Sequence, residues 1–175
     1  KEFPDLREFL KAVHGLPKSN ASSIAVLFNR VDFLDYFTRH PRFGDVCDES
    51  TFQAAVESAN FETLKYAHQK FFRGKSLQCV NSFRFIVKGN VAAMKYLVEH
   101  GLPVDVEMCE KAAHVGSLPV LKYLHNHFPQ SSPHINFIGL TAAQYDQVEC
   151  LEYAVERGCE VNTELCRAAI AATGG

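Results

Sequence analysis

Five of the six tyrosines follow the same kind of dipeptide at a nearly constant interval. Each is preceded by an apolar residue and then a charged one, and the successive spacings are 30, 30, 27 and 30 residues. These residues are Tyr36, Tyr66, Tyr96, Tyr123 and Tyr153. Self-similarity at an interval of a few tens of residues is the signature of a repeat protein, in which each unit packs against its neighbours. The chain is therefore predicted to fold as a stack of similar units.

The apolar residue two positions before each tyrosine serves as the anchor of its unit. Small or apolar pairs lie nine and eight residues before it, as Ala112-Ala113 precede Leu121, and another apolar residue lies three after it. Positions twelve, nine, eight and five before the anchor have the i, i+3, i+4, i+7 spacing of one buried helix face. Each unit is therefore predicted to be a helix, a tight turn and a second helix.

Residues typical of turns and helix ends lie where this prediction needs them. The position five before the anchor holds Asn29, Ala59, Gly89, Gly116 and Asp146. Most of these tolerate a left-handed backbone. Six after the anchor the residues are basic or titratable, namely His40, Lys70, His100, His127 and Arg157. Such side chains favour the C-terminus of a helix because they complement its exposed carbonyls. Gly101 and Gly158 then follow as predicted helix caps.

The segment from Ala112 to Leu124 resembles the ankyrin repeat, with paired alanines, a glycine turn and an apolar second helix. The resemblance covers about residues 22–170. Within the ankyrin family, the repeats are similar to the divergent arrays of protists, their pathogens and giant viruses. It implies an all-α, ankyrin-like solenoid of stacked helix-turn-helix repeats. No copy has the Thr-Pro-Leu-His sequence that usually opens the first helix, and the repeats are 27–30 residues long where ankyrin repeats have about 33. Both differences fall on the segment that forms the projecting finger loops in the family, so we expect short or reduced finger loops.

The predicted organisation has two parts. Residues 1–21 are predicted to form an N-terminal helical cap, with Leu6, Phe9, Leu10 and Val13 on its apolar face, and a linker at Lys18-Ser19-Asn20. Residues 22–175 are predicted to form the array, with five repeats and a partial sixth that begins at Cys166.

The composition narrows the classes of partner. The net charge is −2 with both signs interspersed, so no basic face for nucleic acid or an acidic membrane is expected. No apolar run approaches the ~20 residues that cross a bilayer. We expect an intracellular protein of the cytoplasm or nucleus and a monomer. In one version of this expectation the chain is secreted by a pathogen and delivered into a host cell.

The sequence offers no pattern for catalysis, a cofactor or a metal. It contains no G-x-S-x-G, P-loop or H-E-x-x-H motif, so the protein is predicted not to be an enzyme. His125 and His127 would point about 200° apart on one helix and could not share a metal.

The six cysteines include no C-x-x-C pair, and reduced, core-filling thiols are expected. Cys159 is predicted to be the most exposed thiol.

The outward side of each first helix is the predicted binding surface, together with the loop tips. Positions ten and seven before the anchor lie opposite the buried face, and Tyr145 lies beside them as a candidate hot spot. The predicted partner-binding residues are Glu57, Arg84, Lys88, Lys111, His114, Thr141, Gln144 and Tyr145, with Phe72 and Arg73 at a loop tip. The alternative for Phe71 and Phe72 is that they are buried where this loop folds back. The predicted function is non-catalytic binding of a partner protein, in one version a host protein bound by a pathogen effector. The alternative is an adaptor fragment that recruits substrates to a larger enzyme assembly, such as a ubiquitin ligase.

Overall fold

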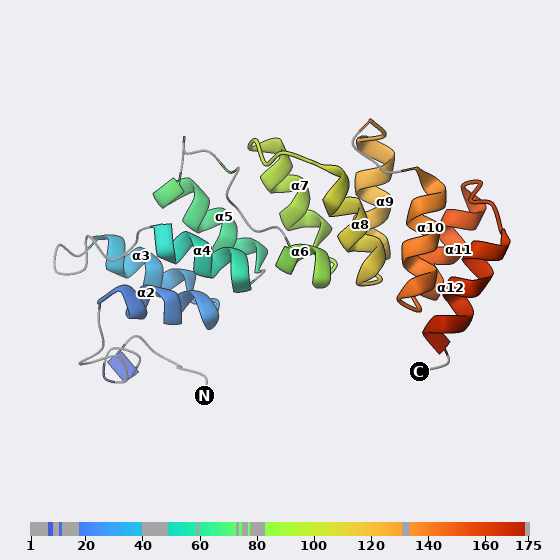
Figure 1. Ribbon diagram of the computed structural model, residues 1–175. Helices are drawn as coiled ribbons and strands as arrows, with labels where there is room; N and C mark the ends of the chain where they lie inside the picture. The colour runs from blue at the N-terminus through green and yellow to red at the C-terminus, as the bar shows by residue number, and fades with distance from the viewer. Residues whose placement is uncertain are drawn as a thin grey trace. The chain divides into compact units, whose positions relative to one another are not determined.

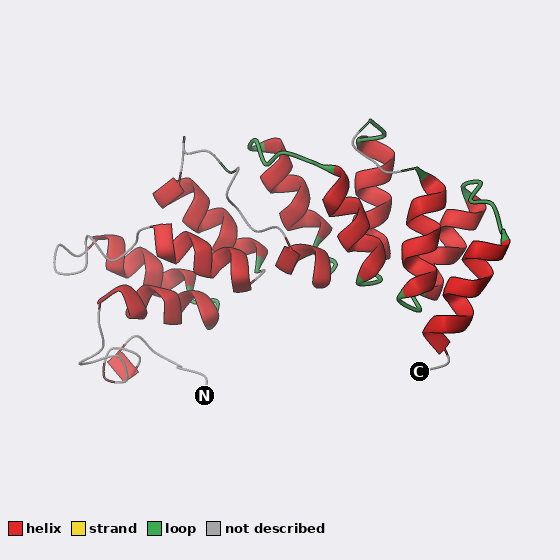
Figure 2. Ribbon diagram, in the orientation of Figure 1, coloured by secondary structure: helices red, strands yellow, loops and turns green. Residues whose placement is uncertain are grey.

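A computed structural model describes residues 7–8, 11, 18–39, 49–58, 60–72, 74, 77, 83–130 and 134–173. All regular structure in these ranges is helical and none is strand, which confirms the predicted all-α class (Figure 2). The chain divides into two compact units, Lys1–Ser76 and Leu77–Gly175, where the sequence predicted one array over residues 22–175.

The labelled helices of the first unit form pairs (Figure 1). Its helices are α2 (Lys18–Leu27), α3 (Val31–Arg39), α4 (Glu49–Ser58) and α5 (Phe61–Ala67), which continues as a π-helical turn, η2 (His68–Phe72). The first helices α2 and α4 pack together, and so do the second helices α3 and α5. The predicted linker at Lys18–Asn20 is wrong, because these residues form the first turn of α2. The predicted apolar face of the cap lies outside the described residues.

The second unit repeats the arrangement. Its helices are α6 (Phe83–Val87), α7 (Val91–Glu99), α8 (Val106–His114), α9 (Leu118–His127), α10 (Ile135–Gln144), α11 (Val148–Glu156) and α12 (Thr163–Thr173). The first helices α6, α8, α10 and α12 pack in a row, and the second helices α7, α9 and α11 form another (Figure 1). The helix-turn-helix period predicted from the tyrosines is therefore confirmed within each unit.

The residues that define the repeat form the core. The pairs nine and eight before the anchors are all at most 2% exposed, and the residues three after the anchors are fully buried. Alanine at many of these positions lets adjacent helices approach closely while keeping high helix propensity. The buried pairs are Ala25-Val26, Ala55-Val56, Phe85-Ile86, Ala112-Ala113 and Ala142-Ala143.

The turns between paired helices share one backbone geometry. Asn29, Gly89, Gly116 and Asp146, each five residues before its anchor, have φ between 53° and 71°. In each turn the next residue donates its N–H to the carbonyl five positions earlier, as Ser117 does to Ala112 at 2.8 Å. This bond belongs to the Schellman motif, which satisfies the last carbonyls of a helix and favours residues that tolerate positive φ. The predicted left-handed turns are confirmed at these four positions.

The repeated tyrosines lie in related surroundings. Tyr66 donates a hydrogen bond of 3.1 Å to Asp35 of the preceding pair, and Tyr153 lies against the equivalent Lys122, whose Nζ is 5.5 Å from the ring centre. At three of these tyrosines, the basic residue four positions later, at the end of the same helix, packs against the tyrosine ring. Tyr96–His100 and Tyr123–His127 have ring centres 4.2 and 4.7 Å apart, and the Arg157 guanidinium lies 5.2 Å from Tyr153.

The loop after α11 packs closely against α10 at Gly139, which has no side chain. Gly139 occupies the position twelve before its anchor that Cys109 has in α8. A Cβ at Gly139 would collide with the sulfur of Cys159, which comes from the loop after α11. Cys159 is only 6% exposed, so the prediction that it is the most exposed thiol is wrong. Among the described cysteines, Cys166 is exposed while Cys109 and Cys150 are buried, as expected for core-filling thiols.

Candidate functional site: two grooves beside Phe137

The outward surfaces of α8 and α10 enclose a groove of about 300 Å³. Its α8 side carries charged residues and a histidine, and its α10 side carries aromatic and polar residues. The lining residues are Glu107, Glu110, Lys111, His114, Phe137, Thr141, Gln144 and Tyr145. Four of them, Lys111, His114, Thr141 and Gln144, have the outward positions of the repeat register, and Tyr145 was predicted to lie beside them.

Side-chain contacts fix the position of several residues that line this groove. The Lys111 ammonium lies 2.8 Å from the Glu107 carboxylate one helical turn away, and 6.0 Å from the ring centre of Phe83 on α6. Across the groove the rings of His114 and Tyr145 are 3.8 Å apart and tilted by 42°. Tyr145 remains 49% exposed despite this contact, so much of the ring is open to a partner.

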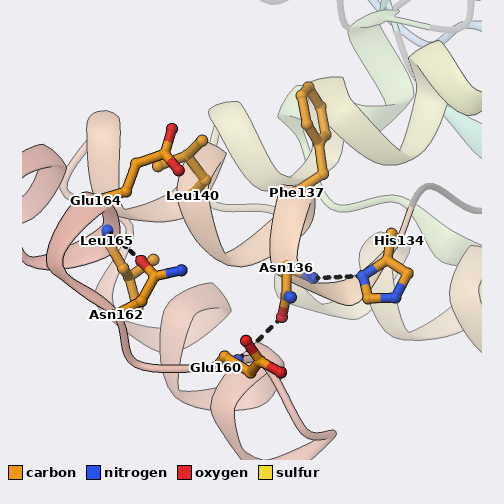
Figure 3. A pocket seen from close by; sticks show the side chains of 8 residues that line it. All are labelled: His134, Asn136, Phe137, Leu140, Glu160, Asn162, Glu164 and Leu165. Atoms are coloured by element: carbon orange, nitrogen blue, oxygen red, sulfur yellow. Dashed lines mark hydrogen bonds between the residues drawn. The ribbon is translucent and has the colours of Figure 1, made fainter.

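A second groove, of about 310 Å³, lies between α10 and α12 (Figure 3). It was not predicted from the sequence. Its apolar part consists of Phe137, Leu140 and Leu165, and the rest is polar. The polar lining residues are His134, Asn136, Glu160, Asn162 and Glu164.

Hydrogen bonds from backbone N–H groups position two polar side chains of the second groove. Asn162 Oδ1 accepts the Leu165 N–H at 3.0 Å in the first turn of α12. Asn136 Oδ1 accepts the Glu160 N–H at 2.9 Å, which fixes the loop after α11 against the start of α10. Figure 3 shows both bonds, with the Phe137 ring projecting away from Asn136 and Glu160. The close approach of this loop also depends on Gly139, whose missing side chain leaves room for Cys159.

Phe137 lines both grooves and is 45% exposed. It lies fourteen residues before its anchor, and Glu107 has the same place in α8. Glu164 is the equivalent residue in α12, two before Cys166 as Glu107 is two before Cys109. This position extends the outward face by one helical turn beyond the two positions predicted, because fourteen, ten and seven before the anchor share one side. The same spacing rule could have found it.

The other predicted binding residues have mixed outcomes. Arg84 and Lys88 are exposed at α6 of the second unit, and Glu57 is exposed on α4 of the first. Thr141 is only 9% exposed, so it forms the floor of the groove instead of projecting outward. Phe72 is 3% exposed and stacks on Phe52 with ring centres 4.3 Å apart, so its prediction as a loop-tip contact is wrong. Arg73 lies outside the described residues.

The titratable groups of the core reflect burial. Burial raises the pKa of the Cys150 thiol to about 11 and also raises that of Cys159. Burial lowers the pKa of His125, and the nearby Arg157 charge adds to the effect. Within the described ranges, no three His, Cys, Asp or Glu side chains are grouped to hold a metal ion. No described helix combines the length and the apolar character that a membrane span needs.

No model of a known protein family matches the sequence, and no curated protein matches it either.

Proposed function

We propose that this chain is an ankyrin-like repeat protein that binds a partner protein through the outward surface of α8, α10 and α12. The proposal includes no catalytic step and no cofactor. It is supported by the helix pairs, by the left-handed turns between them and by paired alanines such as Ala112-Ala113 in the core.

One observation carries the proposal. Side chains from two helices that are about thirty residues apart in the chain meet in one groove beside two half-exposed aromatic rings, Phe137 and Tyr145. Scattered single apolar residues are normal on a protein surface, but aromatic side chains gathered at a groove are typical of binding hot spots. The helices beneath are fixed by buried contacts, so the surface is presented with little conformational cost on binding.

A quantitative pull-down tests the proposal. The tagged full chain and a Lys111→Glu/Tyr145→Ala variant, which changes two residues that line the first groove, are incubated with the same lysate, and bound proteins are compared by mass spectrometry. The matched control, Glu152→Lys/Val155→Ala, also reverses one charge and removes one exposed apolar side chain, on α11 in the second-helix row. Circular dichroism checks that all three proteins fold.

The expected result is that the groove variant loses a partner about tenfold or more while the control keeps it. Retention of every partner by the groove variant would contradict the binding of a protein partner through Lys111 and Tyr145, and an equal loss in the control would mean that the loss is not specific to this surface.

A further inference from the structure

The two grooves beside Phe137 have an excess of negative charge. Four carboxylates line them, from Glu107, Glu110, Glu160 and Glu164, against one ammonium from Lys111. Lys111 is paired with Glu107. Within the part of the chain that the structure describes, the other three carboxylates have no ion pair.

The second groove also offers hydrogen-bond donors. Asn136 and Asn162 each use Oδ1 to accept a backbone N–H, so the amide orientation is fixed and Nδ2 is the donor. Neither Nδ2 group has a partner among the described residues, and Figure 3 shows that of Asn162 on the groove side. Side-chain amides in this position are suited to the backbone carbonyls of an extended peptide.

Phe137 supplies the apolar contact between the two acidic regions. Its ring lines both grooves, and Leu140 lies beside it in the second. One aliphatic side chain on a ligand can therefore pack against Phe137 and Leu140 while its neighbours reach carboxylates on either side of α10.

We propose that these grooves bind an extended peptide segment in which one aliphatic residue is flanked on both sides by lysine or arginine. The aliphatic side chain lies on Phe137 and Leu140, one basic side chain approaches Glu110, and another approaches Glu160 and Glu164. This inference rests on the proposed function and names the chemistry of its partner. Nucleic acid and anionic membranes are disfavoured by the same carboxylates, since both require a positive surface.

The probe is a fluorescein-labelled peptide with the core Arg-Lys-Leu-Arg-Lys between glycines, measured against the full chain by fluorescence anisotropy. Two control peptides replace either the leucine by serine or all four basic residues by glutamate. Binding is expected for the probe, about tenfold weaker binding for the serine peptide, and none for the glutamate peptide. Raising the salt concentration is expected to weaken probe binding, because exposed charge pairs are screened. Equal affinity for the probe and the serine peptide would overturn the proposal, since simple charge attraction would then explain the binding.

Variants locate the binding on the protein. Phe137→Ala is expected to weaken the probe about tenfold, and Glu160→Gln/Glu164→Gln by a similar factor at low salt. The matched control Glu152→Gln/Glu156→Gln removes the same charge from α11 and is expected to leave affinity within about twofold. If Glu152→Gln/Glu156→Gln weakened binding as much as Glu160→Gln/Glu164→Gln, the assignment of the peptide to these grooves would be wrong.

The two proposals can fail separately. If the groove variant loses a protein in the pull-down but the probe does not bind, partner binding stands and the basic-peptide inference is wrong. If the probe binds and responds to Phe137→Ala while the pull-down shows no loss, the grooves bind the peptide, and the proposal that a protein partner contacts Lys111 and Tyr145 is wrong.

Discussion

The Tyr66 hydroxyl donates a 3.1 Å hydrogen bond to Asp35, thirty-one residues earlier in the chain. Tyr153 approaches Lys122 over the same interval in the second unit, and its hydroxyl lies 2.8 Å from Nδ1 of His125. At these two positions the tyrosine of one helix pair therefore contacts the pair before it.

Replacing Tyr153 by phenylalanine is expected to lower the free energy of unfolding by about 1 kcal/mol. The ring stays in place, but His125 loses a hydrogen-bond partner at a part-buried contact. Urea denaturation measures the change. The control is Tyr145→Phe, because that residue is half exposed and its contact with His114 is made by the ring, which phenylalanine keeps. Equal losses for the two variants would mean that the link between repeats contributes nothing.

Gly139→Ala is expected to destabilise the protein although alanine is the better helix former by about 1 kcal/mol. The new Cβ would collide with the Cys159 sulfur and would contact the Ala154 Cβ at 3.5 Å. Adding Cys159→Ala is expected to recover stability, which a double-mutant cycle measures. Additive effects of the two substitutions would contradict the proposed packing of the loop on α10.

Phe72→Ala is expected to cost about 3–5 kcal/mol of stability, as for other buried aromatic residues. The reason is the stacked contact with Phe52 inside the first unit. Thermal or urea unfolding measures it, and Leu27→Ala on the exposed side of α2 is the control. A near-neutral Phe72 variant would restore the prediction of a surface contact that the structure contradicts.

Thiol labelling of the folded chain at pH 7.5 is expected to reach Cys166 well before Cys150. The thiolate is the reactive form, and burial raises the pKa of Cys150 to about 11, so almost none is ionised at this pH. Cys166 is exposed to the reagent. Iodoacetamide labelling followed by peptide mass spectrometry follows each residue separately. The difference should disappear in denaturant, and comparable rates in the folded chain would contradict the buried position of Cys150.

The all-α class and the register of the helix pairs could be predicted because they depend on local spacing. The paired alanines, the left-handed turns and the cations after each tyrosine all lie at fixed distances from one anchor within a single unit. The same register selects Lys111, His114, Thr141 and Gln144, which line one groove. Such features can be predicted because they depend only on the spacing of residues along neighbouring turns of a helix.

The failures depend on contacts between distant segments. Cys159 is buried because Gly139, twenty residues earlier, leaves space for its sulfur, and no local pattern around Cys159 indicates this. Phe72 was assigned to a loop because the anchor pattern ends near Lys70, whereas a π-helical turn carries the chain on to the Phe52 ring. The second groove was missed because it needs the loop after α11 to be placed against α10.

The most direct test of the central claim is a set of ¹H–¹⁵N spectra of the full chain, recorded while the Arg-Lys-Leu-Arg-Lys peptide is added. Amide shifts are expected to concentrate in α8, in α10 around Phe137, and from Glu160 into the first turn of α12. Amides of α9 and α11 should stay nearly unchanged. Shifts centred on α9 and α11, or no shifts at saturating peptide, would contradict the account.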